Sequence, residues 1–234
     1  MVLLGTIVNG ICIIVGTLIG TFLTNINEKY KETITQGIAL TAILIGIQMA
    51  LQVQSVIIIL LSILTGAIIG ELLDLEKGLN KIGTWVANRF AMKESNTNIA
   101  QAFVTASLLF SVGAMAILGA LDSGLRGEHE LLYTKSVLDG FTSFVLTTTL
   151  GVGVIFSAIP VVIFQGAIAL LATQIEKLIP DVLFEQILNN ITAVGGLLII
   201  AIGLNILKLT TIRVTNLLPS LVTVIIFIVT LQLF

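Results

Sequence analysis

Long apolar stretches recur throughout this chain of 234 residues. A helix that crosses about 30 Å of hydrocarbon needs about 20 mostly apolar residues. Such stretches occupy residues 2–24, 33–52, 55–72, 98–121, 134–156, 158–178, 187–207 and 214–234. Charged residues make up only 10% of the chain, whereas soluble domains carry about 25% to keep their surface wet. The sequence therefore predicts an all-α, polytopic transmembrane bundle of about eight helices, with the lipid bilayer as its main partner.

The border between the fifth and sixth stretches is the least clear. Only the segment from Ser157 to Pro160 separates them, although together they exceed one span. Proline favours a helix break, because it lacks the backbone N–H and crowds the preceding turn. We therefore place the break here, with seven helices as the alternative count.

The distribution of basic residues predicts the orientation of the helices, because Lys and Arg are retained on the cytoplasmic side. With the N-terminus outside, three basic residues lie in outer segments: Arg126, Lys135 and Lys177. Eight lie in inner segments: Lys29, Lys31, Lys77, Lys81, Arg89, Lys93, Lys208 and Arg213. This asymmetry favours eight spans with both termini outside the cytoplasm.

Residues 73–97, between the third and fourth stretches, predict an amphipathic helix and a short linker. Apolar residues recur there at steps of three and four, namely Leu72, Leu75, Leu79, Ile82, Val86 and Phe90. The basic residues fall on other faces, which is typical of a helix lying on the inner leaflet. We interpret it as an interfacial strut, with lipid sensing or partner binding as the alternative.

The chain also resembles itself at a shift of 156 to 157 residues. Asn9-Gly10 aligns with Gln165-Gly166. Gly46 aligns with Gly203, and Gln48 aligns with Asn205. Residues 1–72 would thus recur as 158–234 in the opposite orientation, with 98–156 as two central helices. Inverted repeats of this kind are typical of secondary transporters. The alternative is chance similarity between helices built from few residue types.

Four amides occupy matching places in this repeat. In the expected topology Asn9 and Gln48 lie in the outer half of the membrane, and Gln165 and Asn205 lie in the inner half. We expect them to line two related half-pathways.

One carboxylate lies inside an apolar stretch. A charge at the centre of a membrane helix costs about 2.5–3.5 kcal/mol on insertion scales, so it normally faces a cavity or a partner. Asp139 is placed about one turn inside the fifth stretch, and Lys135 lies four residues earlier on the same helix face. The pair is interpreted either as a cation or proton site with a switchable counter-ion, or as a snorkelling pair near the helix end.

Other polar residues have weaker claims to a role in a pathway. Thr147 and Thr148, followed by Gly151, could form an unwound turn in mid-membrane, or could simply pack helices closely. Ser111 falls on the fourth stretch, where a serine can also bond to its own helix. Glu71 and Arg213 are expected at the inner boundary, as interfacial and topology-setting charges.

Small-residue spacing also predicts close helix packing at two places. Gly16-x-x-x-Gly20 and Gly66-x-x-x-Gly70 have the spacing that lets helix backbones approach each other.

Several function classes find no support in the sequence. No nucleophile elbow, phosphate-binding glycine loop or H-E-x-x-H motif occurs, so we expect neither an enzyme nor an ATP-driven pump. The single cysteine, Cys12, and the single histidine, His129, favour no metal site, and no cofactor is expected. A net charge of −2 offers no field for nucleic acid.

Blocks spread over nearly the whole chain resemble the YdfK/YqgA-like family of uncharacterised bacterial inner-membrane proteins. The resemblance lies in 5–10, 66–71, 106–121, 135–141, 150–159, 165–166, 202–207 and 212–219. It implies a location in the bacterial cytoplasmic membrane but no substrate. Family members often have a cysteine at the position of Ser111 and a proline at that of Ala114, so neither a thiol nor a proline kink is expected there.

These observations favour a secondary transporter or ion-coupled permease for a small solute or ion, working by alternating access between inverted halves. The alternatives are a non-transporting scaffold or accessory subunit, whose polar residues only lock helices together, and a passive channel within a symmetric oligomer. A homo-oligomer is compatible with each of these functions.

Overall fold

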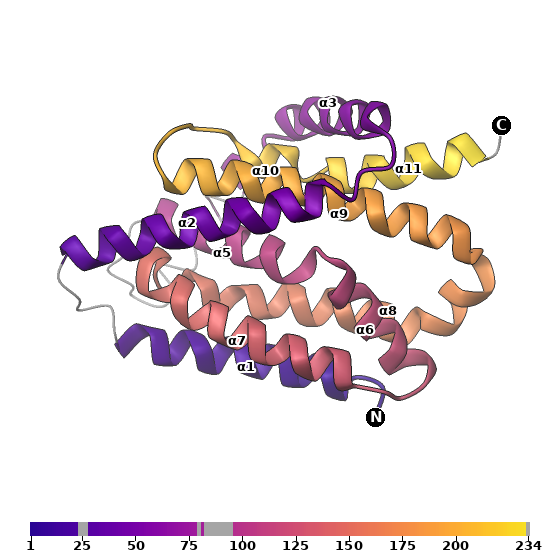
Figure 1. The fold of residues 1–234 in the computed structure, drawn as a ribbon, viewed down its shortest axis with the longest axis horizontal. Helices are drawn as coiled ribbons and strands as arrows, with labels where there is room; N and C mark the ends of the chain where they lie inside the picture. The colour runs from indigo at the N-terminus through magenta and orange to yellow at the C-terminus, as the bar shows by residue number, and fades with distance from the viewer. Residues whose placement is uncertain (23–27, 79–80, 82–95, 233–234) are drawn as a thin grey trace. The chain divides into compact units, whose positions relative to one another are not determined.

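The computed structural model describes residues 1–22, 28–78, 81 and 96–232, and within these residues all regular structure is helical. Figure 1 shows the helices. In chain order they are α1 Leu4–Phe22, α2 Glu28–Ala50, α3 Val56–Leu73, α5 Asn96–Ser111, α6 Ala114–Leu125, α7 Glu130–Leu150, the 3₁₀ helix η1 Val152–Ser157, α8 Ala158–Leu178, α9 Asp181–Ile206, α10 Val214–Leu217 and α11 Ser220–Gln232.

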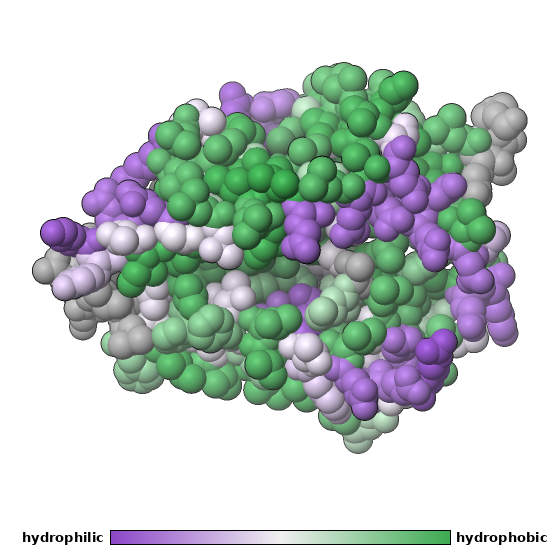
Figure 2. Space-filling model, viewed as in Figure 1, coloured by the Kyte–Doolittle hydropathy of each residue, from purple (hydrophilic) through white to green (hydrophobic). Residues whose placement is uncertain are grey.

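Within the described residues, six helical stretches are long and apolar enough to cross a membrane. They are Leu4–Phe22, Glu32–Ala50, Val56–Leu73, Val152–Leu178, Asp181–Ile206 and Val214–Leu231. A seventh is added if the bent pair α5 and α6 is one broken span. The predicted helical membrane bundle is thus confirmed. Figure 2 shows the apolar surface that it requires, with hydrophobic side chains dominating over α3 and the end of α2 in that view.

Helix α7 accounts for the difference between seven spans and the predicted eight. Its 21 residues extend for about 30 Å at 1.5 Å per residue, which is long enough. Lys135 and Asp139 lie within it, and it is not among the stretches that are apolar enough to count as spans. Helix α7 is therefore long enough to cross a membrane, but it is not apolar enough to be counted as a span on composition.

The expected break between the fifth and sixth stretches is wrong in position. The chain breaks at Gly151, whose φ of 87° suits glycine, because other residues would suffer a clash of Cβ with the backbone. The 3₁₀ helix η1 then leads into α8, and Pro160 lies in the first turn of α8. Proline is tolerated there because the first N–H groups of a helix have no intrahelical acceptor.

The fourth stretch is two helices rather than one. α5 ends at Ser111, α6 begins at Ala114, and the two axes are bent by 58°. Gly113, with φ 148°, makes the bend. The break therefore forms without a proline at position 114.

The structure describes only part of the expected amphipathic segment 73–97. α3 ends at Leu73 and is capped by Asp74, which adopts a left-handed conformation with φ 49°, and Leu75–Gly78 continue as a helical turn. Residues 79–80 and 82–95 lie outside the described residues, so the interfacial helix stays a prediction.

The helices form two compact units. Unit 1 comprises residues 1–34 and 83–178, and therefore α1, α5, α6, α7, η1 and α8. Unit 2 comprises residues 35–82 and 179–234, and therefore most of α2 together with α3, α9, α10 and α11. Each expected three-helix copy thus contributes its first helix to unit 1 and its other helices to unit 2.

Glycines allow the closest helix contacts in both units, as the two small-residue motifs predict. A side-chain carbon at Gly16 would collide with the carbonyl oxygen of Gly140, and one at Gly20 would lie 2.7 Å from that of Phe144. In unit 2, carbons at Gly66 and Gly70 would collide with Ser220 and Asn216. In both cases packing depends on the missing side chain.

Candidate functional site

Three helices of unit 1 bring together four of the predicted polar residues. Asn9 lies on α1, Lys135 and Asp139 lie one turn apart on α7, and Gln165 lies on α8. Asp139 is nine residues from the start of α7, which is about 14 Å along the axis. The expectation that Asp139 lies about one turn inside its helix is therefore wrong, because α7 begins at Glu130 rather than at 134.

The four side chains form a continuous hydrogen-bonded group, which we call the Asp139 cluster. The Nζ atom of Lys135 lies 2.9 Å from both carboxylate oxygens of Asp139. The amide nitrogen of Asn9 donates to Asp139 Oδ2 at 3.0 Å and to Gln165 Oε1 at 3.3 Å. Asn9 thus links α1 to both α7 and α8.

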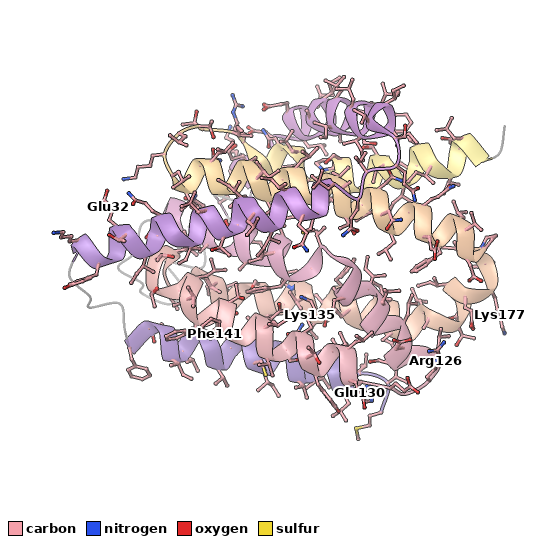
Figure 3. The ribbon with its side chains drawn as sticks, in the orientation of Figure 1. Glu32, Arg126, Glu130, Lys135, Phe141 and Lys177 are labelled. Carbon is pink, nitrogen blue, oxygen red and sulfur yellow. The ribbon has the colours of Figure 1, made fainter. Side chains whose placement is uncertain are left out.

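Burial of the Asp139 cluster costs free energy. Asn9 and Gln165 are 0% exposed, and the side chains of Lys135 and Asp139 are 10% and 8% exposed. Removing two charges from water costs several kcal/mol per ion, which their attraction repays only with good geometry and further hydrogen bonds. Figure 3 labels Lys135 on α7 between Glu130 and Phe141. Phe141 is 68% exposed, so it lies on the opposite, lipid-compatible face.

The directions of the helices follow from their contacts. Positions Gly5, Gly16 and Gly20 of α1 meet Leu132, Gly140 and Phe144 of α7 in the same order, so these helices run parallel. Glycines at the contact bring α1 close enough to α7 for the short side chain of Asn9 to reach Asp139.

Helix α8 runs antiparallel to α1. A side-chain carbon at Gly10 would lie 2.5 Å from Val162 Cγ2, and one at Gly166 would lie 3.9 Å from Thr6 Cγ2. This antiparallel crossing places Asn9 and Gln165 at the same height. The two amides, which were expected in the outer and inner halves of the membrane, are hydrogen-bonded to each other, so they belong to one cluster rather than to two separate half-pathways.

Some polar atoms around the cluster have no hydrogen-bond partner among the described residues. They are Asn9 Oδ1, Gln165 Nε2 and the hydroxyl oxygen of Thr6, which lies one turn before Gly10 on α1. All three side chains are 0% exposed. A buried polar atom without a partner costs about 1–3 kcal/mol, so this spare acceptor, donor and hydroxyl call for an explanation.

A stripe of polar residues continues from Asp139 along α7. Lys135, Asp139, Ser143 and Thr147 recur at steps of four and are all buried. The hydroxyl of Ser143 donates to the Asp139 carbonyl at 2.7 Å, and that of Thr147 donates to the Ser143 carbonyl at 2.6 Å. Thr148 donates to Val145 in the same way. The threonines therefore bond to their own helix.

Sequence reasoning missed Thr6 and Ser143. The signal for Ser143 was present, because a four-residue step from Lys135 passes through it to Thr147. Thr6 becomes notable only through its neighbour on α8.

The remaining predicted residues lie away from the cluster. Gln48 of α2 is exposed. Asn205 of α9 fastens the loop to α10: its side chain accepts from Thr210 at 2.8 Å and from the Ile212 N–H at 2.9 Å. Ser111 is half-buried at the α5–α6 bend, and its hydroxyl has no partner among the described residues.

Glu71 and Arg213 meet in unit 2. The guanidinium Nη1 of Arg213 lies 2.8 Å from Glu71 Oε2, and the two side chains are 61% and 52% exposed. This ion pair joins the end of α3 to the start of α10. Over the part of the chain that the structure describes, no three His, Cys, Asp or Glu side chains gather as a metal site.

Comparisons with known proteins find relatives of uncharacterised function. A family model described as "Protein of unknown function (DUF554)" matches residues 4–229. The chain is 36% identical over 222 residues to the "Uncharacterized membrane protein YdfK" of Bacillus subtilis, covering 93% of this chain and 92% of that protein. It is 31% identical over 222 residues to the "Uncharacterized protein YqgA" of Escherichia coli, covering 93% of each. No solved structure matches.

Proposed function

Because the chain belongs to the DUF554 family of membrane proteins of unknown function, we propose its function from the chemistry of the Asp139 cluster: an ion-coupled secondary transporter. The observation that carries this proposal is a carboxylate buried midway along α7, paired with a lysine of the same helix and joined through the Asn9 amide to that of Gln165.

Stability alone is a poor reason for this charged pair. Replacing a buried ion pair by apolar residues of similar volume is often neutral or stabilising. Helices in membranes can be locked by amides and hydroxyls without any charge. An ionisable residue inside a membrane is therefore a functional-site hypothesis by default, and here its partner is Lys135.

The geometry supports exchange of the partner of Asp139. Lys135 has a flexible four-carbon stem, so its ammonium group can leave Asp139 without any change in α7. A proton or an alkali cation would then neutralise the carboxylate. The Asn9 Oδ1 atom and the Thr6 hydroxyl, which have no partner among the described residues, are the oxygen atoms available to such a cation.

The pairing of α1 with α8 supports alternating access. Asn9 and Gln165 lie 156 residues apart and are hydrogen-bonded to each other. The same shift relates Gly10 to Gly166 and Thr6 to Val162, so the contact of Gly10 with Val162 has its counterpart in that of Gly166 with Thr6. Reciprocal contacts of this kind arise when two copies of one segment pack about a two-fold axis.

Unit 2 supplies a second reciprocal set. A side-chain carbon at Gly46 would lie 2.7 Å from Ile200 Cγ1, and one at Gly203 would lie 2.5 Å from Ile43 Cγ1. Both glycines and both isoleucines are 157 residues apart. Both sets of contacts support an inverted repeat, and inverted repeats underlie rocking motions in transporters.

The topology proposed for this mechanism has eight crossings of the cytoplasmic membrane and both termini outside. Helix α7 runs parallel to α1 along its length, so we count it as a span together with the bent pair of α5 and α6. The substrate would be a small solute or ion, and the role of the chain would be transport rather than catalysis.

Flux measurements in proteoliposomes test the proposal. Vesicles with a pH-sensitive dye inside would receive a membrane potential, then a Na⁺ or K⁺ gradient, then an external mixture of amino acids and sugars. We expect the wild type to move protons or cations, and Asp139→Asn to fall to the rate of protein-free vesicles. Glu71→Gln is the matched control, since it removes an exposed carboxylate from an ion pair. Absence of any Asp139-dependent flux would reject the transporter.

A scaffold or accessory subunit is the second candidate, and one observation favours it. Asn9 bonds to both α7 and α8, so it locks three helices together as a structural residue would. On this reading Asp139→Asn lowers stability or assembly, and wild-type vesicles show no flux.

A further inference from the structure

A cavity in unit 2, lined by both polar and apolar residues, has no place in the function proposed above. It has a volume of about 330 Å³ and lies between the start of α3, the first turns of α9 and the end of α11. It is lined by Gln54, Ser55, Ile58, Gln186, Asn190, Ile228 and Leu231. The cavity is therefore surrounded by residues far apart in the chain.

Asn190 is the deepest polar residue of this cavity. It is 2% exposed, and its amide nitrogen donates to the Gln186 carbonyl at 2.8 Å. Its Oδ1 atom has no partner in the described part of the chain. Buried carbonyl oxygens are normally bonded, whereas this acceptor without a partner belongs to a residue that lines the cavity.

The lining is neutral. Gln54, Gln186 and Asn190 provide amides, each with two N–H donors and an acceptor, and Ser55 provides a hydroxyl. Among the described residues, no charged side chain lines the cavity, whereas a desolvated ion needs a charged partner. A neutral ligand with several hydrogen-bonding groups matches this surface.

The other wall is apolar and firmly held. Ile228 is 3% exposed and belongs to the buried core of unit 2 with Ile59, Ala193, Val194 and Val224. Ile58 and Leu231 continue this wall. A ligand with hydroxyl groups on its edges and C–H groups on its faces fits such a two-sided cavity.

The volume of the cavity limits the class of ligand further. A volume of 330 Å³ is about that of eleven molecules of liquid water, and a six-carbon sugar has a similar number of non-hydrogen atoms. We propose that this cavity binds a neutral polyhydroxylated solute, of the size of a monosaccharide, through Asn190, Gln186 and Gln54. The site belongs to unit 2 alone and requires no ion movement through the Asp139 cluster.

Cysteine protection tests the site directly, because the chain has a single cysteine, Cys12. In a Cys12→Ala background, Ser55→Cys places a thiol in the cavity wall. Full-length protein in nanodiscs would be treated with N-ethylmaleimide, with and without D-glucose or D-sorbitol. We expect either solute to slow the labelling of Ser55→Cys severalfold.

Two controls make the result specific. Gln52→Cys lies in the same connection between α2 and α3 but does not line the cavity, and its labelling should not change. Adding Asn190→Ala, or the half-buried Gln186→Leu if the first variant does not fold, should abolish the protection. Equal labelling of Ser55→Cys with and without the two solutes would overturn the proposal. Equal slowing of the labelling of Gln52→Cys would also overturn it, as would protection of Ser55→Cys by NaCl but by neither solute. None of these outcomes depends on flux, so failure of the transport function leaves this test intact.

Discussion

At the scale of single residues, two of the ion pairs in the described part of the chain lie in opposite environments. Lys135 and Asp139 are almost completely buried, whereas Glu71 and Arg213 are more than half exposed. Exposed pairs are worth about 0–1 kcal/mol because water and salt screen them. Removing one partner of a buried pair leaves an uncompensated charge, which costs about 3–5 kcal/mol.

We therefore expect Lys135→Met to reduce the free energy of unfolding by about 3–5 kcal/mol. The double variant Lys135→Met/Asp139→Leu should recover most of this loss, because no buried charge remains. Thermal unfolding in detergent, followed by circular dichroism, measures both. Equal losses in the single and double variants would show that the two residues do not act as a pair.

Arg213→Ala should cost less than about 1 kcal/mol in the same measurement, because its pair with Glu71 is exposed. A loss as large as that of Lys135→Met would mean that the contact between α3 and α10 holds unit 2 together.

At the scale of helices, packing of α1 on α7 depends on missing side chains. We expect Gly16→Ala to destabilise the protein by about 1–3 kcal/mol, the usual cost of overpacking, because the new methyl group collides with the Gly140 carbonyl. Gly37→Ala on α2 is the matched control, since a carbon there meets nothing within 4 Å. It should be neutral or stabilising, because alanine favours helices over glycine. Similar melting temperatures for the two variants would contradict this account of the contact.

The bend between α5 and α6 depends on the backbone rather than on packing. Gly113 has φ 148° and has open space around it. Gly113→Ala should therefore destabilise the protein through strain alone, by about 1–3 kcal/mol. Thermal unfolding beside Gly37→Ala measures the effect. An unchanged melting temperature would mean that the bend tolerates an ordinary residue.

At the scale of the whole molecule, the basic residues predict which ends face the cytoplasm. A C-terminal fusion to alkaline phosphatase should be active, and one to green fluorescent protein should be dark, because both termini are expected outside. Fusions placed after Lys208, in a predicted inner loop, should give the reverse pattern. A fluorescent C-terminal fusion would reject eight crossings with an outer N-terminus.

The sequence by itself determined the class of fold and the environment. Eight apolar stretches and few charges leave lipid as the only suitable surroundings, and hydrophobic length and small-residue spacing are local properties that a single stretch displays. The positions at which the helices break were harder to predict from the sequence. Gly151 and Pro160 are both breakers in sequence, and only the backbone conformation distinguishes a positive-φ glycine from a proline in a first turn.

The candidate site was foreseen in its members but not in its arrangement. Asp139 and Lys135 are four residues apart on one helix, so their pairing follows from helix geometry. Asn9 and Gln165 were expected at different depths, and only the antiparallel crossing of α1 and α8 brings their amides into contact. The cavity around Asn190 had no sequence signal, because its walls come from three separated helices whose side chains meet only through tertiary packing.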